Sequence, residues 1–179
     1  MATILSWPLL LILTVSADSQ DLIDAIENTA RIKSDGNQTM YAKLETGKYV
    51  RIFNDEWPDG SIESVGIFEV DGTIRSISVS PVCTSGEWSY GTENYYDKRG
   101  SFIGYVEIKN HFKSKCQEGS LHRTKTFIKR GGRLKLVKET ITDEDGKDMS
   151  QAACNDPYDF RPVIIKDARK YRRRIEKEY

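Results

Sequence analysis

The sequence predicts a mainly β protein of the α+β class, built as a curved antiparallel meander sheet or a partly closed barrel. The main observation is a unit that occurs three times: an aromatic residue, three further residues, a glycine and an apolar-rich run. Glycine adopts positive φ without steric cost, as tight turns between antiparallel strands often require, so each unit predicts a β-hairpin. Repeated hairpins make a meander. The three units begin with Phe68–Gly72, Tyr96–Gly100 and Phe127–Gly131.

Length and composition favour one domain with an ordinary core. The chain has 179 residues, of which 38% are hydrophobic and 30% charged, as is usual for a soluble protein. Lys plus Arg equals Asp plus Glu at 27 each, so the net charge points to no particular partner. The charge is uneven, because residues 166–179 carry seven basic and three acidic side chains. We therefore expect a single β-rich domain over residues 18–165 and a basic C-terminal tail over 166–179.

The N-terminus has the pattern of a secretory signal peptide. The first seventeen residues carry no charge, Ile4–Val15 is mostly apolar, and Val15-Ser16-Ala17 is a small-x-small cleavage pattern. The alternative is a membrane anchor, but the apolar run is shorter than the ~20 residues that span a bilayer. The sequence therefore predicts cleavage before Asp18 and export to the periplasm or the extracellular space, with no transmembrane segment in the mature chain.

Three cysteines fit an oxidising compartment with one disulfide and one free thiol. They are Cys83, Cys116 and Cys154, and each follows a predicted hairpin. Cys116 falls between the second and third hairpins and so borders both of the others. We therefore expect Cys116 to be bridged to either Cys83 or Cys154.

The elements follow from periodicity and turn signals. Leu22, Ile23, Ile26 and Ala30 share one helical face, which predicts an amphipathic helix over about residues 20–33. The β region then begins, and Asp71-Gly72 is one of the strongest short hairpin signals. The expected strands and hairpins cover 40–44 with 49–53, 62–70 with 73–79, 93–109, 122–141 and a last short strand near 149–153.

The C-terminal region offers weaker signals. Val163–Ile165 is a candidate to pack back on the sheet. Residues 167–178 show no strong apolar face, so we expect a frayed or solvent-exposed helix there.

Two turn motifs carry a resemblance. With the N-terminal helix, the runs Tyr-Tyr-Asp-Lys-Arg-Gly (95–100) and Phe-Ile-Lys-Arg-Gly-Gly-Arg-Leu (127–134) make residues 20–140 resemble small uncharacterised exported bacterial β proteins. The resemblance implies export and a hairpin-rich sheet, and it brings no catalytic residues. The units are also similar to other aromatic-glycine hairpin repeats such as the MORN type, although the spacing here is longer and less regular.

No catalytic or metal motif stands out. Gly-x-Ser-x-Gly, His-Glu-x-x-His, the Walker loop and the Rossmann glycine pattern do not occur. His111 and His122 flank Cys116, but this spacing matches no common zinc pattern. The acidic run Asp143–Asp148 resembles part of a calcium loop, but position 12 is Cys154, so a hairpin turn is favoured. We assign no catalytic residue, metal ligand or cofactor.

The densest aromatic cluster of the chain lies in and beside the longest predicted connection, residues 81–92. Long connections in compact β domains are uncommon unless they serve a function, and rings beside acids could bind a sugar or a peptide. The alternative is that these rings pack within the sheet. The candidate binding residues are Trp88, Tyr90, Tyr95, Glu87 and Glu93.

These observations favour an exported, non-enzymatic binding protein that binds or inhibits another protein. The expected partner is a protein or a cell-envelope polymer, and export argues against nucleic acid despite the basic tail. One alternative is a small exported hydrolase acting on sugar or peptide polymers, with acids such as Glu87 and Glu93. Another is a structural envelope protein.

Overall fold

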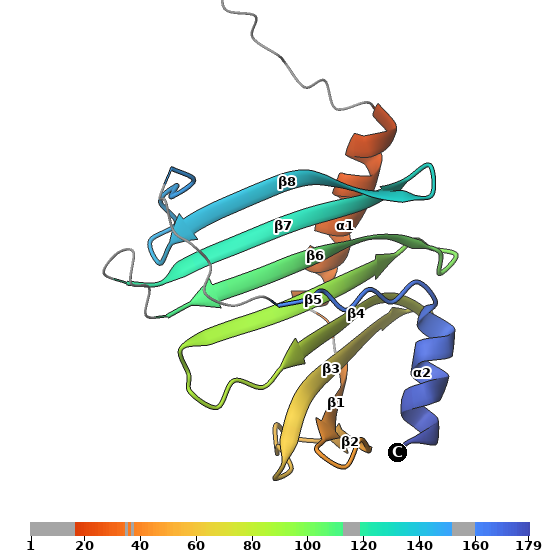
Figure 1. Cartoon of the computed structure of the whole chain (residues 1–179). Coiled ribbons are helices and arrows are strands. Elements are labelled where there is room, and N and C mark those ends of the chain that lie inside the picture. Colours follow the sequence, from red (N-terminus) through yellow and green to blue (C-terminus); the bar gives the residue numbers. More distant parts are fainter. Residues whose placement is uncertain (1–16, 35, 37, 113–118, 152–159) are drawn as a thin grey trace, which may run out of the picture.

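The protein is one open, curled sheet of eight antiparallel strands with two helices (Figure 1), which confirms the predicted fold class. The computed structural model describes residues 17–34, 36, 38–112, 119–151 and 160–179. The strand order is β2-β1-β3-β4-β5-β6-β7-β8, so β2 and β8 are the two edges. The elements are α1 (Ala17–Ser34), β1 (Gln38–Leu44), β2 (Tyr49–Ile52), β3 (Ser61–Val70), β4 (Thr73–Pro81), β5 (Trp88–Tyr96), β6 (Phe102–His111), β7 (Leu121–Arg130), β8 (Arg133–Asp143) and α2 (Ala168–Lys177).

The three predicted hairpins are confirmed as β3–β4, β5–β6 and β7–β8. Because neighbouring strands alternate in direction, all three hairpin turns lie at the same end of the strands, which we call the turn edge. At the first turn Asp71 and Gly72 have φ of 51° and 71°. Positive φ at both central residues is what a two-residue hairpin turn that matches the strand twist requires, and Asp-Gly is among the pairs that adopt it most readily.

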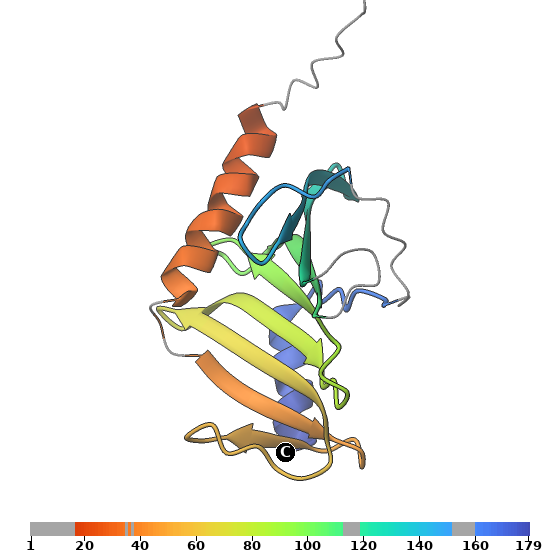
Figure 2. The same cartoon turned by 90° about the vertical axis from the view of Figure 1, so that its left-hand side faces the viewer.

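Helix α1 covers the convex face of the sheet across β5–β7 (Figure 2). Ile23 and Ile26, one turn apart on the helix, are buried against Tyr95, Ile103 and other apolar side chains of these strands. The predicted helix is thus confirmed, with bounds a few residues wider than expected.

Helix α2 covers the concave face over the β1–β4 half. Ile175 is fully buried and Ala168 nearly so, in a core that also holds Val65 and Ile77. The expectation of a frayed or solvent-exposed helix was wrong. Ala168, Tyr171 and Ile175 recur at i, i+3 and i+7, and this narrow stripe is enough to seat a helix that is otherwise basic.

Residues 160–167 cross the concave face of β5 and lead into α2, and we call them the strap. Asn94 is fully buried and holds the strap twice: its side-chain amide donates to the Val163 carbonyl (3.0 Å) and accepts from the Ile165 N–H (2.8 Å). The Tyr96 hydroxyl donates to the Ile165 carbonyl at 2.7 Å. Packing of Val163–Ile165 back onto the sheet is therefore confirmed.

The structure differs from the expectations for the connection after β4 and for the last strand. Strand β5 already begins at Trp88, so the connection after β4 is shorter than the predicted 81–92 segment. At the predicted last strand, Asp148 forms an isolated bridge with Thr142, and residues beyond 151 on that segment lie outside the described part. In the described ranges, neither helix is long and apolar enough to cross a membrane.

The described residues test the cysteine and signal-peptide predictions only in part. Cys83 is a free thiol in the structure, while Cys116 and Cys154 lie outside the described residues. A bridge from Cys116 to Cys83 is therefore not present, and one to Cys154 stays a prediction. Of the predicted signal peptide only Ala17 is described, as the first residue of α1.

Candidate functional site

The concave face of β5–β8, on the side of the strap away from α2, carries charged, aromatic and exposed apolar side chains together. We call it the concave site. Side chains alternate between faces along a strand, and directly paired residues share a face. Tyr90 pairs with Lys109, Lys109 with Arg123, and Arg123 with Ile141, so this row crosses all four strands on one face.

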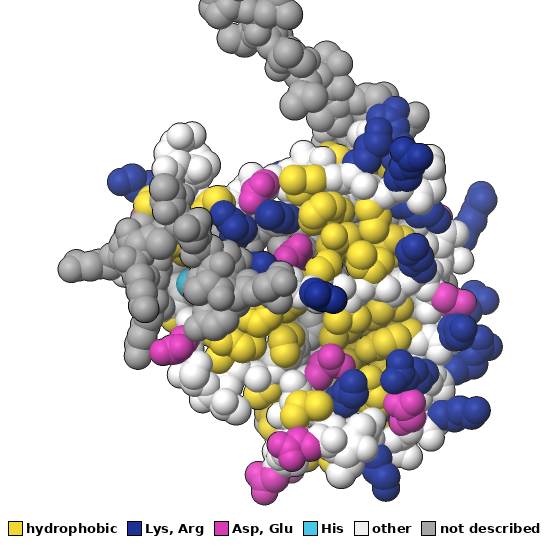
Figure 3. Space-filling model, in the orientation of Figure 1, with side chains coloured by type: hydrophobic (Ala, Val, Ile, Leu, Met, Phe, Trp, Pro, Cys, Tyr) yellow, Lys and Arg dark blue, Asp and Glu magenta, His cyan; other side chains and the backbone are white. Residues whose placement is uncertain are grey.

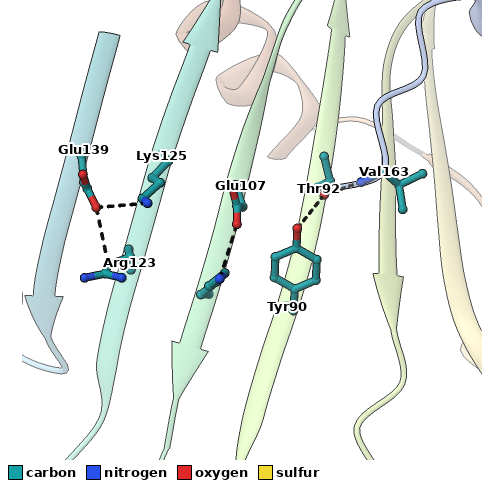
Figure 4. Close-up of polar contacts among 8 residues, drawn as sticks. Tyr90, Thr92, Glu107, Arg123, Lys125, Glu139 and Val163 are labelled. Atoms are coloured by element: carbon teal, nitrogen blue, oxygen red, sulfur yellow. Dashed lines mark hydrogen bonds and ion pairs between the residues drawn. The ribbon is translucent and has the colours of Figure 1, made fainter. Parts of the chain in front are cut away.

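A charged stripe runs across the concave site (Figure 4). Glu139 on β8 faces two cations of β7, with its Oε1 at 3.5 Å from Arg123 Nε and 3.6 Å from Lys125 Nζ. On β6, Glu107 pairs with Lys109 at 3.6 Å. The side chains of the second pair are only 11% and 14% exposed, whereas Glu139 is 37% exposed. Solvent therefore reaches the stripe mainly from the β8 side, where its charges can exchange one partner for another.

An aromatic corner closes the stripe at β5. Phe160 of the strap stacks on Tyr90, with ring centroids 4.7 Å apart, and lies against Trp88 at 4.5 Å. Lys109 Nζ sits 5.7 Å from the centroids of both the Tyr90 and Phe160 rings, a cation–π distance. Burial raises the pKa of Tyr90 to about 12, and its hydroxyl lies 3.4 Å from the Thr92 hydroxyl. Trp88 and Tyr90 thus anchor the strap at one border of the concave site.

An apolar patch lies between the stripe and the turn edge. Tyr105 and Phe127 stack with centroids 4.6 Å apart and form part of the core. Leu136 is paired with Phe127 across β7 and β8, and it is 47% exposed. Val163 and Ile164 of the strap are each 37% exposed. Figure 3 shows apolar side chains gathered on this face, bordered by basic ones.

At the outer end of the stripe the surface is hollowed. The hollow has a volume of about 620 Å³, is open to solvent and includes both Arg123 and Glu139. Its remaining lining comes from β8 and the turn that follows: Thr140, Ile141, Thr142, Gly146, Asp148 and Ser150. Such a lining offers hydrogen bonds and charge to a polar group and little apolar enclosure.

The structure separates the five residues that the sequence grouped. Trp88 and Tyr90 face the concave site. Tyr95 points to the convex face, where it is 2% exposed and α1 covers it. Burial, followed by the neighbouring Glu93 carboxylate, raises the pKa of Tyr95. Glu93 is on that face too, paired with Lys33 of α1, and Glu87 is exposed in the connection before β5.

Most residues of the concave site were missed in the sequence, although β7 carried a signal. Leu121, Arg123, Lys125 and Phe127 alternate with polar residues, so a period of two places them on one face. Two cations between two apolar residues on one face of a strand indicate that solvent reaches part of that face. Phe160 could not be found this way, because it reaches the site from a distant segment.

The geometry does not support a metal site at the two histidines or at the acidic run Asp143–Asp148. Within the described ranges, no three His, Cys, Asp or Glu side chains lie together in a way that could hold a metal ion. His122 Nδ1 is 2.9 Å from Asn110 Oδ1, and the pairing of His111 with Leu121 places the two histidines on opposite faces. Asp143 accepts from the backbone N–H groups of Asp145 and Lys147, as a tight turn requires.

Comparison with known proteins gave no match: no family model fits the chain, and no curated protein or solved structure is detectably similar to it. The functional argument therefore depends on the geometry of the concave site.

Proposed function

We propose that the chain is an exported, non-enzymatic binding protein that holds another protein through the concave site. The observation that carries the proposal is the exposed apolar patch around Leu136, which lies beside a charged stripe on the part of the concave face that no described helix covers. Protein interfaces combine an apolar centre, aromatic and arginine side chains and a polar rim. The concave site has these components on one continuous surface.

The shape of the site supports a macromolecular partner over a small molecule. Small-molecule sites are usually enclosed clefts lined mainly by apolar side chains, with a few convergent polar groups. The hollow beside Arg123 is open and its lining is mostly polar. It suits a side chain of a partner that also covers Leu136 and Phe127.

The partner would carry apolar and charged groups in matching positions. Arg123 and Lys125 share one carboxylate, that of Glu139, so an acidic side chain of the partner can pair with either cation. We therefore expect an acidic residue of the partner at the hollow and apolar residues over the patch. Export is part of the proposal on the strength of the N-terminal sequence pattern alone.

The hydrolase alternative gains no support from its suggested acids. Glu93 lies on the convex face, paired with Lys33, whereas Trp88 and Tyr90 face the other side of the sheet. A substrate lying on these rings would not reach both Glu87 and Glu93 as the sequence interpretation requires.

Site-specific photo-crosslinking tests the proposal. A photoreactive residue at Leu136 should give a discrete adduct in cells that produce the protein, and mass spectrometry of that adduct identifies the partner. The matched control is Ile62, which is 42% exposed and lies on β3, in the half of the sheet that α2 covers and away from the concave site. Binding of the identified partner to purified protein should weaken by about 2 kcal/mol or more in Leu136→Asp and stay unchanged in Ile62→Asp. Adducts of equal yield from both positions, or unchanged binding in Leu136→Asp, would remove the concave site from consideration.

A further inference from the structure

The turn edge of the molecule carries a dense set of exposed basic side chains that the proposed function does not use. The β5–β6 turn contributes Lys98 and Arg99, and the β7–β8 turn contributes Lys129 and Arg133. Helix α2 begins just after the strap leaves Tyr96, at the turn-edge end of β5, and adds Lys170 and Arg173. Its C-terminus reaches the other end of the strands, where the Tyr49 N–H donates to the Glu178 carbonyl at 3.2 Å. We call these six residues the basic edge. Figure 3 shows Lys and Arg side chains along this border of the molecule.

The basic edge has little internal compensation. Its six side chains are all exposed, and none forms an ion pair with any residue that the structure describes. The nearby Asp97 and Asp167 accept backbone N–H groups, at the β5–β6 turn and at the N-cap of α2. On α2 the buried stripe of Ala168 and Ile175 turns Lys170 and Arg173 outward. These cations are therefore available to an external anion.

The opposite end of the strands exposes more acidic than basic side chains. Its connections carry Glu45, Asp59, Glu87, Glu144 and Asp145 beside Lys48, Lys147 and Arg161. The described part of the molecule therefore has a charge asymmetry along its strands. An anionic surface would attract the turn edge and repel the other end, so it would orient the molecule as well as bind it.

The N-terminal region connects the basic edge to a membrane. The Arg130 guanidinium donates to the Ser19 hydroxyl at 3.2 Å, so the first turn of α1 is fixed at the β7–β8 turn. The apolar run Ile4–Val15 directly precedes this helix in the sequence. When that run associates with a bilayer, Lys129 and Arg133 of the β7–β8 turn lie beside the helix that follows it.

We propose that the basic edge docks on an anionic phospholipid bilayer surface, with the strands pointing away from the membrane. Clusters of Lys and Arg beside an apolar segment are typical of attraction to acidic lipids. Single-stranded nucleic acid is usually held by exposed aromatic rings as well as by cations. Among the described residues, the exposed aromatic side chains lie elsewhere: Phe53, Trp57, Phe112 and Tyr179.

Vesicle sedimentation of the full chain tests this proposal. The two vesicle types are pure phosphatidylcholine and phosphatidylcholine with about one third phosphatidylglycerol, so the difference in binding measures the charge contribution. The wild-type chain should bind the anionic vesicles more strongly, and the difference should shrink on going from about 0.05 M to 0.5 M salt. Any contribution of the apolar N-terminal run is common to both vesicle types.

Two charge-reversal variants distinguish the effect of the basic edge on vesicle binding from the effect of net charge. In one variant Lys129, Arg133 and Lys170 are changed to Glu. In the other, Lys48, Lys147 and Arg161 are changed to Glu; these are also exposed, but they lie at the far end of the sheet. Each basic residue near an acidic surface contributes about a fivefold change in binding, so the loss of three cations and the added repulsion of three carboxylates should lower the charge-dependent binding at low salt by at least about 100-fold. The second variant should lose less than about threefold.

The remaining outcomes overturn the proposal. Equal losses in the two variants would show that net charge, and not the basic edge, governs binding. Equal binding to both vesicle types by the wild-type chain would leave only the apolar run as the membrane contact. Salt-sensitive binding to duplex DNA without binding to anionic vesicles would assign the basic edge to nucleic acid.

Discussion

The two halves of the sheet use the same alternation of side chains but differ in what covers their concave faces. In the β1–β4 half, α2 lies over the sheet, and Val65, Ile67, Ile77 and Val79 beneath it are at most 2% exposed. In the β5–β8 half the strap is the one described segment that crosses the face, and Leu136 is 47% exposed beside paired charges. The concave face of the first half is a finished core, whereas that of the second half is a surface suited to a partner.

The same comparison explains why helix α1 does not cover the concave face of the β5–β8 half. It covers β5–β7 from the convex side, where Ile23 and Ile26 meet Ile128. The two helices therefore stabilise opposite faces, and among the described elements no helix covers the other face of either half. An open antiparallel sheet can keep one face in water, so such a face does not by itself require a partner.

The largest expected effect is the loss of packing under α2. Ile175→Ala should lower the free energy of unfolding by about 2–4 kcal/mol, because Ile175 is fully buried and the methyl groups removed leave a cavity. Leu136→Ala should cost less than about 1 kcal/mol, because that side chain is already half in solvent. Urea denaturation of both variants measures the difference. Similar losses in the two variants would show that the open half is as well packed as the covered one.

Removal of the strap anchor should rank next. Asn94→Ala deletes both hydrogen bonds to the strap and leaves the Ile165 N–H without its acceptor, which should cost about 2–3 kcal/mol. Amide exchange at Ile165 should accelerate in the variant. Asn110→Ala is the control, since Asn110 is only partly buried and bonds Ser89 instead. If exchange at Ile165 is unchanged in Asn94→Ala, the Asn94 hydrogen bonds do not hold the strap, and its bonds to Tyr96 and Thr92 with its apolar contacts are sufficient.

A carboxylate beneath α2 should give a smaller, pH-dependent effect. Desolvation raises the pKa of Glu63, and the nearby Lys43 and Arg174 oppose this only in part. A raised folded-state pKa means that the stabilising contribution of Glu63 is complete below its unfolded pKa and is lost as pH rises through the folded value. Glu63→Gln should therefore gain stability relative to wild type as pH increases from acid to neutral. Unfolding curves at a series of pH values test this, and a relative loss of stability on that path would contradict it.

The smallest expected effect is on the chemical reactivity of Cys83, which lies in the connection between the two halves of the sheet. It involves no change in the free energy of unfolding. Desolvation opposes the shift, but hydrogen bonds from Ser85 and from the N–H groups of Gly86, Glu87 and Trp88 lower the pKa of the Cys83 thiol to about 7. Since the thiolate is the reactive form, the rate of alkylation at Cys83 should reach half its maximum near pH 7, below the ordinary value of about 8.5. Peptide mapping by mass spectrometry follows this one site. A midpoint near 8.5 would show that these hydrogen bonds do not hold the thiolate in solution.

Local signals in the sequence were sufficient for the helix α1 and the hairpins. The apolar face of α1 and the Asp71-Gly72 turn each depend on residues that are neighbours in the chain. The packing of α2 could not be predicted from such local signals. Ala168 and Ile175 are buried only because they enter a core that distant strands form.

The candidate site was predictable only in part for the same reason. Trp88 and Tyr90 were found as aromatic residues, but the alternation within β5 that turns Glu93 and Tyr95 to the other face was hidden by the mixed composition of that strand. Thr92 and Asn94 are polar at concave positions because they bind the backbone of the strap. Those partners lie 71 residues further along the chain, so no window on the sequence contains both.

The strap and α2 also set the order in which this protein can fold. Ile175 fills the core of the β1–β4 half, although the whole β5–β8 half lies between them in the sequence. During synthesis that core cannot close until β5–β8 and α2 have emerged, and its long-range contacts also favour slow folding. A nascent chain would therefore remain open for longer than one whose core is built from neighbouring elements, and a truncation that removes α2 would leave the core of the β1–β4 half uncovered.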